Sequence, residues 1–267
     1  MSSLPPSPAQ AKPRRFTTVR TVLALVLREM STRYGRTPGG YIWAILEPLG
    51  AILVLSIGFS LVFRTPALGT SFILFYATGY LPFSLYQGLS NTISKATNFS
   101  KPLLKYPVVT WLDAILARFF LNSLTEILVS ILLLSGILSM TESRAVLNLP
   151  SAVEAVMLSM LLGLGVGVLN CALMGLFPLW EMIWSIVTRP LFLASGVFFL
   201  FDDMPKFAQE ILWYNPLIHI IGLARTGFYA TYTASYVSHV YVVGVSLTLL
   251  AMGLILMGRY HRDILNR

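Results

Sequence analysis

Three polar residues recur at helical spacing within a long apolar stretch of this sequence. Arg118, Asn122 and Glu126 are each four residues apart, so an α-helix would place them on one face. Ionisable side chains inside a membrane segment are costly and usually face a bundle interior or a water-filled cavity. The stripe therefore fits two roles: the wall or gate of a transport pathway, or an internal ion pair in which Asn122 connects Arg118 to Glu126.

Two further charged residues directly precede prolines within apolar stretches. Glu47 precedes Pro48, which predicts a kink near the start of one membrane segment, with the carboxylate facing protein or water. Arg189 precedes Pro190 in a later segment, where its side chain would line a pathway or extend to the cytoplasmic interface. Both positions are candidate pathway residues.

The chain holds no set of residues that would catalyse a reaction by itself. The phosphate-binding loop of ATPases requires a glycine directly before its lysine, and none of the five lysines follows a glycine. The three histidines are far apart and Cys171 lies in an apolar run, so no metal-ligand spacing occurs. The nearest candidate for catalysis, Asp202-Asp203, is better explained as a helix N-cap. We expect no enzyme and no cofactor in this chain, so ATP-driven transport would need an ATPase on another chain.

The composition restricts the class of protein. Of the 267 residues 56% are hydrophobic and 11% are charged, and the mean hydropathy is +0.74. A soluble domain carries about 25% charged residues, so this chain has too little polar surface to cover a water-soluble globule. The net charge of +8 fits the cytoplasmic loops of a membrane protein, which collect Lys and Arg.

We expect an all-α polytopic membrane protein with six spans, because six apolar stretches approach the roughly 20 residues that a span requires. They cover residues 42–63, 72–89, 111–140, 152–177, 182–201 and 237–257. The third would be roughly 45 Å long, so its first turns would stand in the cytoplasm. The permease domain would then extend over residues 42–258.

The segment before the first span is predicted to be a basic tail followed by an amphipathic helix. Residues 1–16 form a flexible basic tail, and 17–41 an amphipathic helix followed by a basic turn. The apolar residues of this helix recur at steps of three and four: Val19, Val22, Leu23, Val26, Leu27 and Met30. The helix is too short in apolar length to cross, so it would rest on the membrane surface or pack on the protein itself.

The distribution of basic residues orients the chain. If both termini are cytoplasmic, 14 of the 19 Lys and Arg residues lie inside, four lie outside and Arg118 lies within a span. The positive-inside rule therefore predicts cytoplasmic termini, with a tail at 259–267. Residues 202–235 would lie outside, yet they contain an apolar run too short to cross. They would form short re-entrant helices broken near Asn215-Pro216, or an amphipathic loop on the surface.

Four segments together resemble a known family. They read LVLREMSTRYGRTPGGYIWAILEPLG (25–50), SNTISKATNFSKPLLKYP (90–107), RPLFLASGVFFLFDDMP (189–205) and WYNPLIHIIGLARTGFY (213–229). The chain resembles type-2 ABC exporter permeases, most closely those that export capsular polysaccharide (the KpsM-like family). Permeases for O-antigen and teichoic acid are similar in places. A secondary transporter or a membrane-embedded enzyme remain more distant alternatives.

The resemblance implies an inner-membrane homodimer that binds two copies of a separate ATPase, which would hold the ATP and Mg²⁺. It further implies a lipid-linked polysaccharide substrate, a periplasmic adaptor, an outer-membrane exporter and no nucleic acid. The loop at about 91–106 would contain the coupling helix that docks on the ATPase. Its candidate docking residues are Ser94, Lys95, Asn98, Ser100, Lys101 and Lys105.

We also predict the residues of the substrate pathway. Cations before the first span would attract an anionic lipid head or sugar carboxylate. Aromatic side chains could stack on sugar rings, although they also form interfacial belts. The predicted pathway residues are Arg28, Arg33, Arg36, Glu47, Tyr76, Tyr80, Tyr86, Arg118, Glu126, Arg189, Phe198 and Phe199.

Overall fold

The computed structural model describes residues 17–33, 40, 42–104, 109–141 and 147–266, and within these ranges it contains helices and no strand. The elements are α1 (Thr17–Arg33), α2 (Ile42–Ser60), α3 (Phe72–Ser94), α4 (Ala96–Ser100), α5 (Trp111–Met140), α6 (Leu149–Leu176), α7 (Leu179–Leu193), the 3₁₀ helix η1 (Phe201–Asp203), α8 (Lys206–Leu212), α9 (Pro216–Thr226) and α10 (His239–Asn266). The all-α prediction is therefore confirmed for the described residues.

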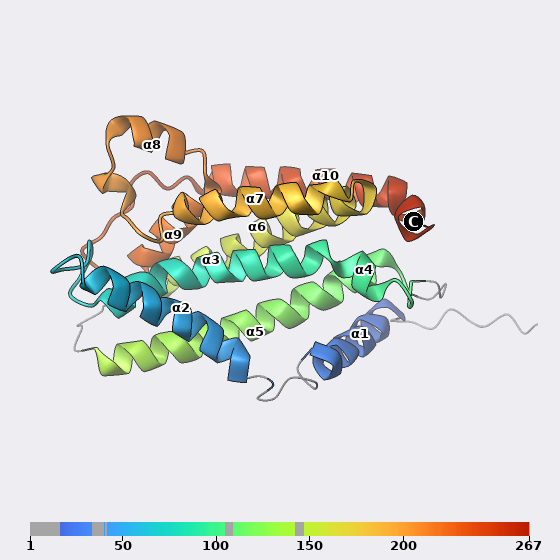
Figure 1. Ribbon diagram of the computed structural model, residues 1–267, viewed down its shortest axis with the longest axis horizontal. Coiled ribbons are helices and arrows are strands. Elements are labelled where there is room, and N and C mark those ends of the chain that lie inside the picture. The colour runs from blue at the N-terminus through green and yellow to red at the C-terminus, as the bar shows by residue number, and fades with distance from the viewer. Residues whose placement is uncertain (1–16, 34–39, 41, 105–108, 142–146, 267) are drawn as a thin grey trace, which may run out of the picture.

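The long helices run lengthwise along the molecule (Figure 1), and α6 lies among them, packed against α3, α9 and α10. Glycines on α6 allow its neighbours to approach closely. A Cβ on Gly163 or Gly167 would lie 2.9 or 2.8 Å from side-chain atoms of α3, and one on Gly165 would lie 2.5 Å from the Ser246 carbonyl oxygen of α10. Small residues at such positions are the usual device for close helix packing in membranes.

Four of the described helices are long and apolar enough to cross a membrane: α2, α5, α6 and α10. The predicted bounds of α5 agree with the structure, and those of α3, α6 and α10 differ only near their ends. α5 begins where a capping box forms, since the Thr110 hydroxyl accepts from the Asp113 amide while the Asp113 carboxylate accepts from the Thr110 amide. α3 has 23 residues but carries polar side chains along one face.

The predicted helix over 182–201 is wrong in its bounds. α7 starts at Leu179 and stops at Leu193, so its 15 residues reach about 22 Å, less than the roughly 30 Å of the hydrocarbon core. The chain then continues without helix to Leu200, with Gly196 at φ 88°. A residue with a side chain rarely adopts this backbone conformation, so glycine permits the turn. Arg189 consequently lies near the end of α7.

Two side chains satisfy the carbonyl groups of this irregular segment. Arg225 of α9, only 2% exposed, donates to the carbonyl oxygens of Val197 and Phe199 at 3.0 and 2.8 Å. Asn215 donates to the Ala194 carbonyl at 2.8 Å. Buried backbone groups need such partners, so α9 stabilises the break after α7.

The amphipathic helix α1 lies at the same end of the bundle as α4 and the C-terminal end of α10 (Figure 1), and it packs on α5. Its Leu25 and Glu29 are buried, whereas most of the predicted apolar face is exposed, including Leu23 and Leu27. α1 therefore packs on α5 through one side, while the exposed residues of its apolar face leave the membrane-surface role a prediction.

The segment after α7 contains three short helical elements. α8 ends at Leu212 and α9 begins at Pro216, so the predicted break near Asn215-Pro216 is present. Asn215 is the N-cap of α9, and its side chain accepts from the Leu217 amide. The N-cap interpretation of Asp202-Asp203 is wrong, because both residues lie within η1 and the hydroxyl of Tyr232 donates to the Asp202 carboxylate.

Candidate functional site

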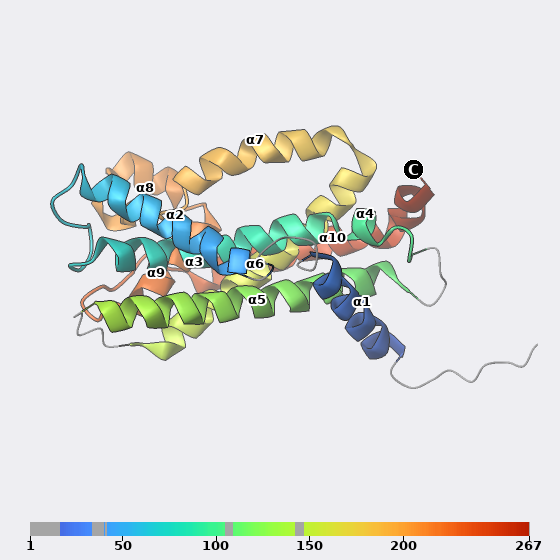
Figure 2. The same ribbon diagram turned by 60° about the horizontal axis from the view of Figure 1, so that its bottom comes forward.

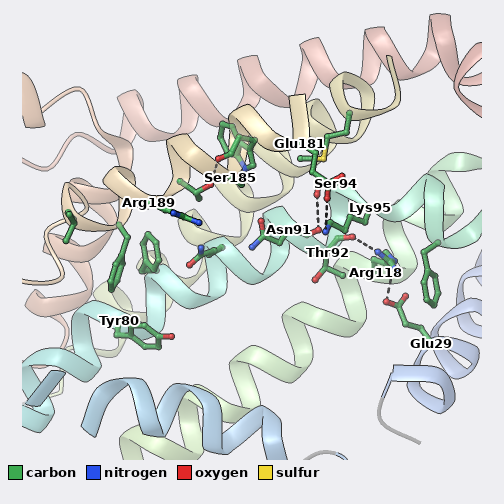
Figure 3. Close-up of a pocket in the computed structure, with 18 residues that line it drawn as sticks. Glu29, Tyr80, Asn91, Thr92, Ser94, Lys95, Arg118, Glu181, Ser185 and Arg189 are labelled. Carbon is green, nitrogen blue, oxygen red and sulfur yellow. Dashed lines mark hydrogen bonds and ion pairs between the residues drawn. The ribbon is translucent and has the colours of Figure 1, made fainter. Parts of the chain in front are cut away.

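A polar groove lies between α3 and α7. In Figure 2, α7 stands apart from α3 over most of its length and joins α6 at one end. The groove has a volume of about 960 Å³. Its charged and polar lining comes from α1, α3, α5 and α7 and from Lys95, which lies between α3 and α4; Figure 3 labels most of these residues. They are Glu29, Tyr80, Gln87, Asn91, Thr92, Ser94, Lys95, Arg118, Glu181, Ser185, Thr188 and Arg189.

α3 carries a polar stripe of which the sequence analysis singled out only Tyr80 and Lys95, and all of its members except Ser84 line the groove. Tyr80, Ser84, Gln87, Asn91 and Lys95 follow one another at steps of four, three, four and four residues. This spacing places them on one helix face. The helical spacing that marks the stripe at 118–126 is also present here, although the apolar residues between these positions dominate the segment.

A second polar pocket of about 330 Å³ lies between α2, α3 and α5. It brings together the two predicted pathway carboxylates, Glu47 and Glu126. Asn122 also lines it, and Tyr80 and Gln87 line both the pocket and the groove. The stripe of α3 therefore connects an acidic pocket on one side to a groove rich in cations on the other.

Arg118 forms an ion pair with a helix far away in the sequence. Its Nε lies 3.3 Å from Oε1 of Glu29 in α1, and both side chains are buried. Its guanidinium also donates to the Thr92 carbonyl at 2.6 Å and lies 4.2 Å from the ring centre of Phe99. Asn122 donates its side-chain amide to the backbone carbonyl of Arg118. The prediction considered only partners within the stripe and missed Glu29.

A second ion pair crosses the groove at the same end. Nζ of Lys95, at the end of α3, lies 3.0 Å from Oε1 of Glu181 in the first turn of α7 (Figure 3). These side chains are 59% and 58% exposed, so water screens the pair strongly. It is a weak and accessible contact, unlike the buried pair of Arg118.

Arg189 lies deeper in the groove, ten residues after the start of α7 and thus about 15 Å along it. Its side chain is exposed. No ion pair of Arg189 is found among the residues that the structure describes. An arginine in such a position is a candidate for binding an anionic ligand.

The predicted aromatic residues separate into different environments. Tyr80 lines both cavities, whereas Tyr76 and Tyr86 are buried in the core. Phe198 is half-buried and its ring centre lies 4.9 Å from that of Phe192, which lines the groove. Phe199 is also half-buried, and its carbonyl binds Arg225.

The predicted docking residues around α4 also differ in exposure. Lys95 and Asn98 are exposed, Lys101 is half-buried, and Ser94 and Ser100 are buried. Arg28 is half-buried, with its guanidinium 5.5 Å from the ring centre of Phe99. Arg36, Lys105 and the side chain of Arg33 lie outside what the structure describes.

The sequence of the chain matches the family model described as "ABC-2 type transporter" over residues 20–229. This chain belongs to the ABC-2 type transporter family. The matched region extends from α1 through Tyr229, just after α9, and so contains the groove and both ion pairs.

Curated relatives match nearly the whole chain. The polysialic acid transport protein KpsM of Escherichia coli is 32% identical over 236 residues, which are 88% of this chain and 92% of that protein. The capsule polysaccharide export inner-membrane proteins CtrC of Neisseria meningitidis and BexB of Haemophilus influenzae are 24% and 26% identical, each over 92% of both chains.

Proposed function

We propose that this chain is the permease subunit of an ATP-driven exporter that moves a lipid-linked capsular polysaccharide across the bacterial inner membrane. The observation that carries the proposal is the similarity to KpsM, CtrC and BexB over nearly the whole length of each protein. The polar groove supports it, since a sugar chain needs hydrogen-bonding groups along its path.

The proposed topology has six spans, formed by α2, α3, α5, α6, α7 and α10. α3 tolerates its polar stripe because it is largely buried among other helices. α7 is short, but protein side chains cover the irregular segment that continues from it. α8 and α9 would then form the re-entrant region on the periplasmic side.

The arrangement of charges supports cytoplasmic termini. The end of the bundle with α1 and α4 carries most of the described basic residues: Arg20, Arg28, Lys95, Lys101, Arg118, Arg259 and Arg262 (Figure 1). Around the opposite end the described basic residues are Arg64, Lys206 and Arg225, the last of which is buried. From the positive-inside rule we infer that the first end is cytoplasmic.

The groove would be half of the conduit, and a second copy of the chain would supply the other half. The outer faces of α2 and α7 expose large apolar side chains, among them Val54 and Ile186, which a second copy or lipid would cover. Arg189 would bind acidic groups of the polysaccharide, while Gln87 and the carboxylates of Glu47 and Glu126 would bind its hydroxyls.

The energy would come from two ATPase subunits that bind ATP and Mg²⁺ and dock on the exposed residues around α4. Movement of α4 would be transmitted to the groove by Lys95, which is the N-cap residue of α4 and lines the groove. A periplasmic adaptor and an outer-membrane exporter would receive the polysaccharide.

Complementation tests the proposed function. We expect the chain, co-expressed with its ATPase, to restore surface capsule in a strain that lacks its own capsule permease. Arg189→Ala should abolish this restoration at normal protein levels, whereas Lys206→Ala, an exposed cation at the opposite end, should not. Failure of the wild-type chain to restore capsule, together with export of an O-antigen or teichoic acid, would overturn the assignment of capsule as substrate.

A further inference from the structure

Contacts near both ends of α7 attach it to the bundle. At its start, the Trp180 indole donates to the Asn170 side chain of α6 at 2.8 Å. Near its end, the Phe192 ring centre lies 4.8 Å from that of Phe83 on α3. Between these anchors the groove separates α7 from α3, and the Lys95–Glu181 ion pair joins the two helices across it.

The two ion pairs at this end of the groove differ in whether a ligand can replace them. Glu29 and Arg118 line the groove, but their side chains are only 6% and 7% exposed, so an anion in the groove has little access to the arginine. Lys95 and Glu181 are both more than half exposed. An arriving anion can therefore compete directly with Glu181 for the ammonium group of Lys95.

We propose that the Lys95–Glu181 pair is a latch at the cytoplasmic mouth of the groove, opened when an anionic group of the substrate replaces Glu181 at Lys95. The proposal rests on the proposed function, which supplies the direction of entry. The arriving carboxylate or phosphate attracts Lys95 and repels Glu181, so the same charge that binds also drives α7 away from α3. A wider groove then gives the anionic group a path to Arg189, the cation farther along the groove on α7.

The position of Lys95 joins the latch to the energy source. Lys95 is the residue between α3 and α4, and it serves as the N-cap position of α4. An ATPase that moves α4 would carry the ammonium group with it. Substrate binding and ATPase movement therefore act on the same ion pair.

Accessibility of a residue beyond the latch tests the proposal. Thr188 is half-buried in the groove, seven residues and about 10 Å past Glu181 along α7. The one native cysteine, Cys171, is buried and would add little background. The full-length Thr188→Cys chain would be placed in nanodiscs of neutral phospholipid and labelled with a bulky maleimide.

Removing the latch should raise the labelling rate. An exposed ion pair changes an equilibrium constant, here that between the closed and open groove, by a factor of about two to five. Adding Glu181→Gln to the Thr188→Cys chain should therefore accelerate labelling by that factor. Adding Glu210→Gln, which removes an exposed carboxylate of α8, should leave the rate unchanged. An unchanged rate with Glu181→Gln would overturn the latch.

Two anionic probes test the trigger and separate its two sources. Oligogalacturonate presents sugar carboxylates, and phosphatidylglycerol added to the nanodisc presents lipid phosphate. With at least one of these probes, the Thr188→Cys chain that keeps the native ion pair should be labelled as fast as the chain that also carries Glu181→Gln. Neutral dextran of equal length should leave the labelling rate unchanged. The probe that succeeds identifies the group that opens the latch, and failure of both overturns the proposed trigger.

The charge swap tests the ion pair itself. Lys95→Glu combined with Glu181→Lys re-forms the pair with its cation on α7, so basal labelling should be slow, and the probe that opens the native pair should still accelerate labelling by binding at position 181 and repelling position 95. Fast basal labelling of the swapped chain would contradict the role of the ion pair in holding the groove closed. These rates are measured without export, so failure of the capsule assignment would appear in the complementation test alone.

Discussion

Replacing Glu29 by leucine should destabilise the protein strongly, because it leaves the guanidinium of Arg118 buried without its carboxylate. Breaking a buried ion pair by removing one partner costs about 3–5 kcal/mol. Arg118 would keep its hydrogen bond to the Thr92 carbonyl and its stacking on Phe99. We therefore expect a loss of about 3 kcal/mol, at the lower end of that range.

The assay is a double-mutant cycle measured by thermal unfolding in detergent. A loss of that size would lower the Tm by about 6–12 °C in a chain of this length. Glu29→Leu combined with Arg118→Met should recover most of the stability, because apolar groups can replace a buried ion pair at little cost. The two changes would thus be strongly non-additive.

The exposed pair provides the matched control. Glu181→Leu also removes a carboxylate from a basic partner, but water screens that pair, so the loss should stay below about 1 kcal/mol. Equal Tm values for Glu29→Leu and Glu181→Leu would refute the reasoning, since burial of the pair would then have no energetic consequence.

Three other substitutions test the packing and the caps by the same unfolding measurement. Gly167→Ala should lower the free energy of unfolding by about 1–3 kcal/mol, because the new Cβ would lie 2.8 Å from the Cβ of Ile93. The control Gly244→Ala, whose Cβ would have no neighbour within 4 Å, should leave the stability unchanged or raise it. Arg225→Met removes the donors to two buried carbonyl groups, so it should lower the free energy of unfolding by about 2 kcal/mol or more and also reduce surface capsule. Wild-type capsule levels would contradict the role of Arg225 in stabilising the break after α7. Thr110→Ala removes the capping box of α5 and should cost only about 1 kcal/mol, and a much larger loss would mean that Thr110 has a further role.

Much of the helical architecture follows from local sequence. α5 has the bounds that its apolar stretch predicts, because a capping box at Thr110 and Asp113 starts it and its apolar residues continue to Met140. The break before α9 was also predictable, since Asn215 and Pro216 favour the N-cap and first position of a helix. In both places a local signal and the tertiary structure agree.

The end of α7 could not be predicted in this way. Its apolar pattern continues beyond Leu193, so hydropathy alone extends the helix to Phe201. The chain leaves the helix because Gly196 permits a positive φ and because Arg225, 28 residues beyond Val197, satisfies the freed carbonyl groups. Such bonds depend on how α9 packs, which no local pattern reveals.

The roles of the cations in the groove are likewise a tertiary property. In the sequence, Arg118, Lys95 and Arg189 are equivalent basic residues at membrane segments or their ends. In the structure, the first is buried with Glu29, the second is exposed with Glu181, and the third is exposed with no ion pair found among the described residues. A buried pair resists exchange, an exposed pair can exchange its anion, and a cation without an ion pair can bind one directly. An acidic polymer that entered the groove at the Lys95 end would therefore first meet an exchangeable contact and then an available one.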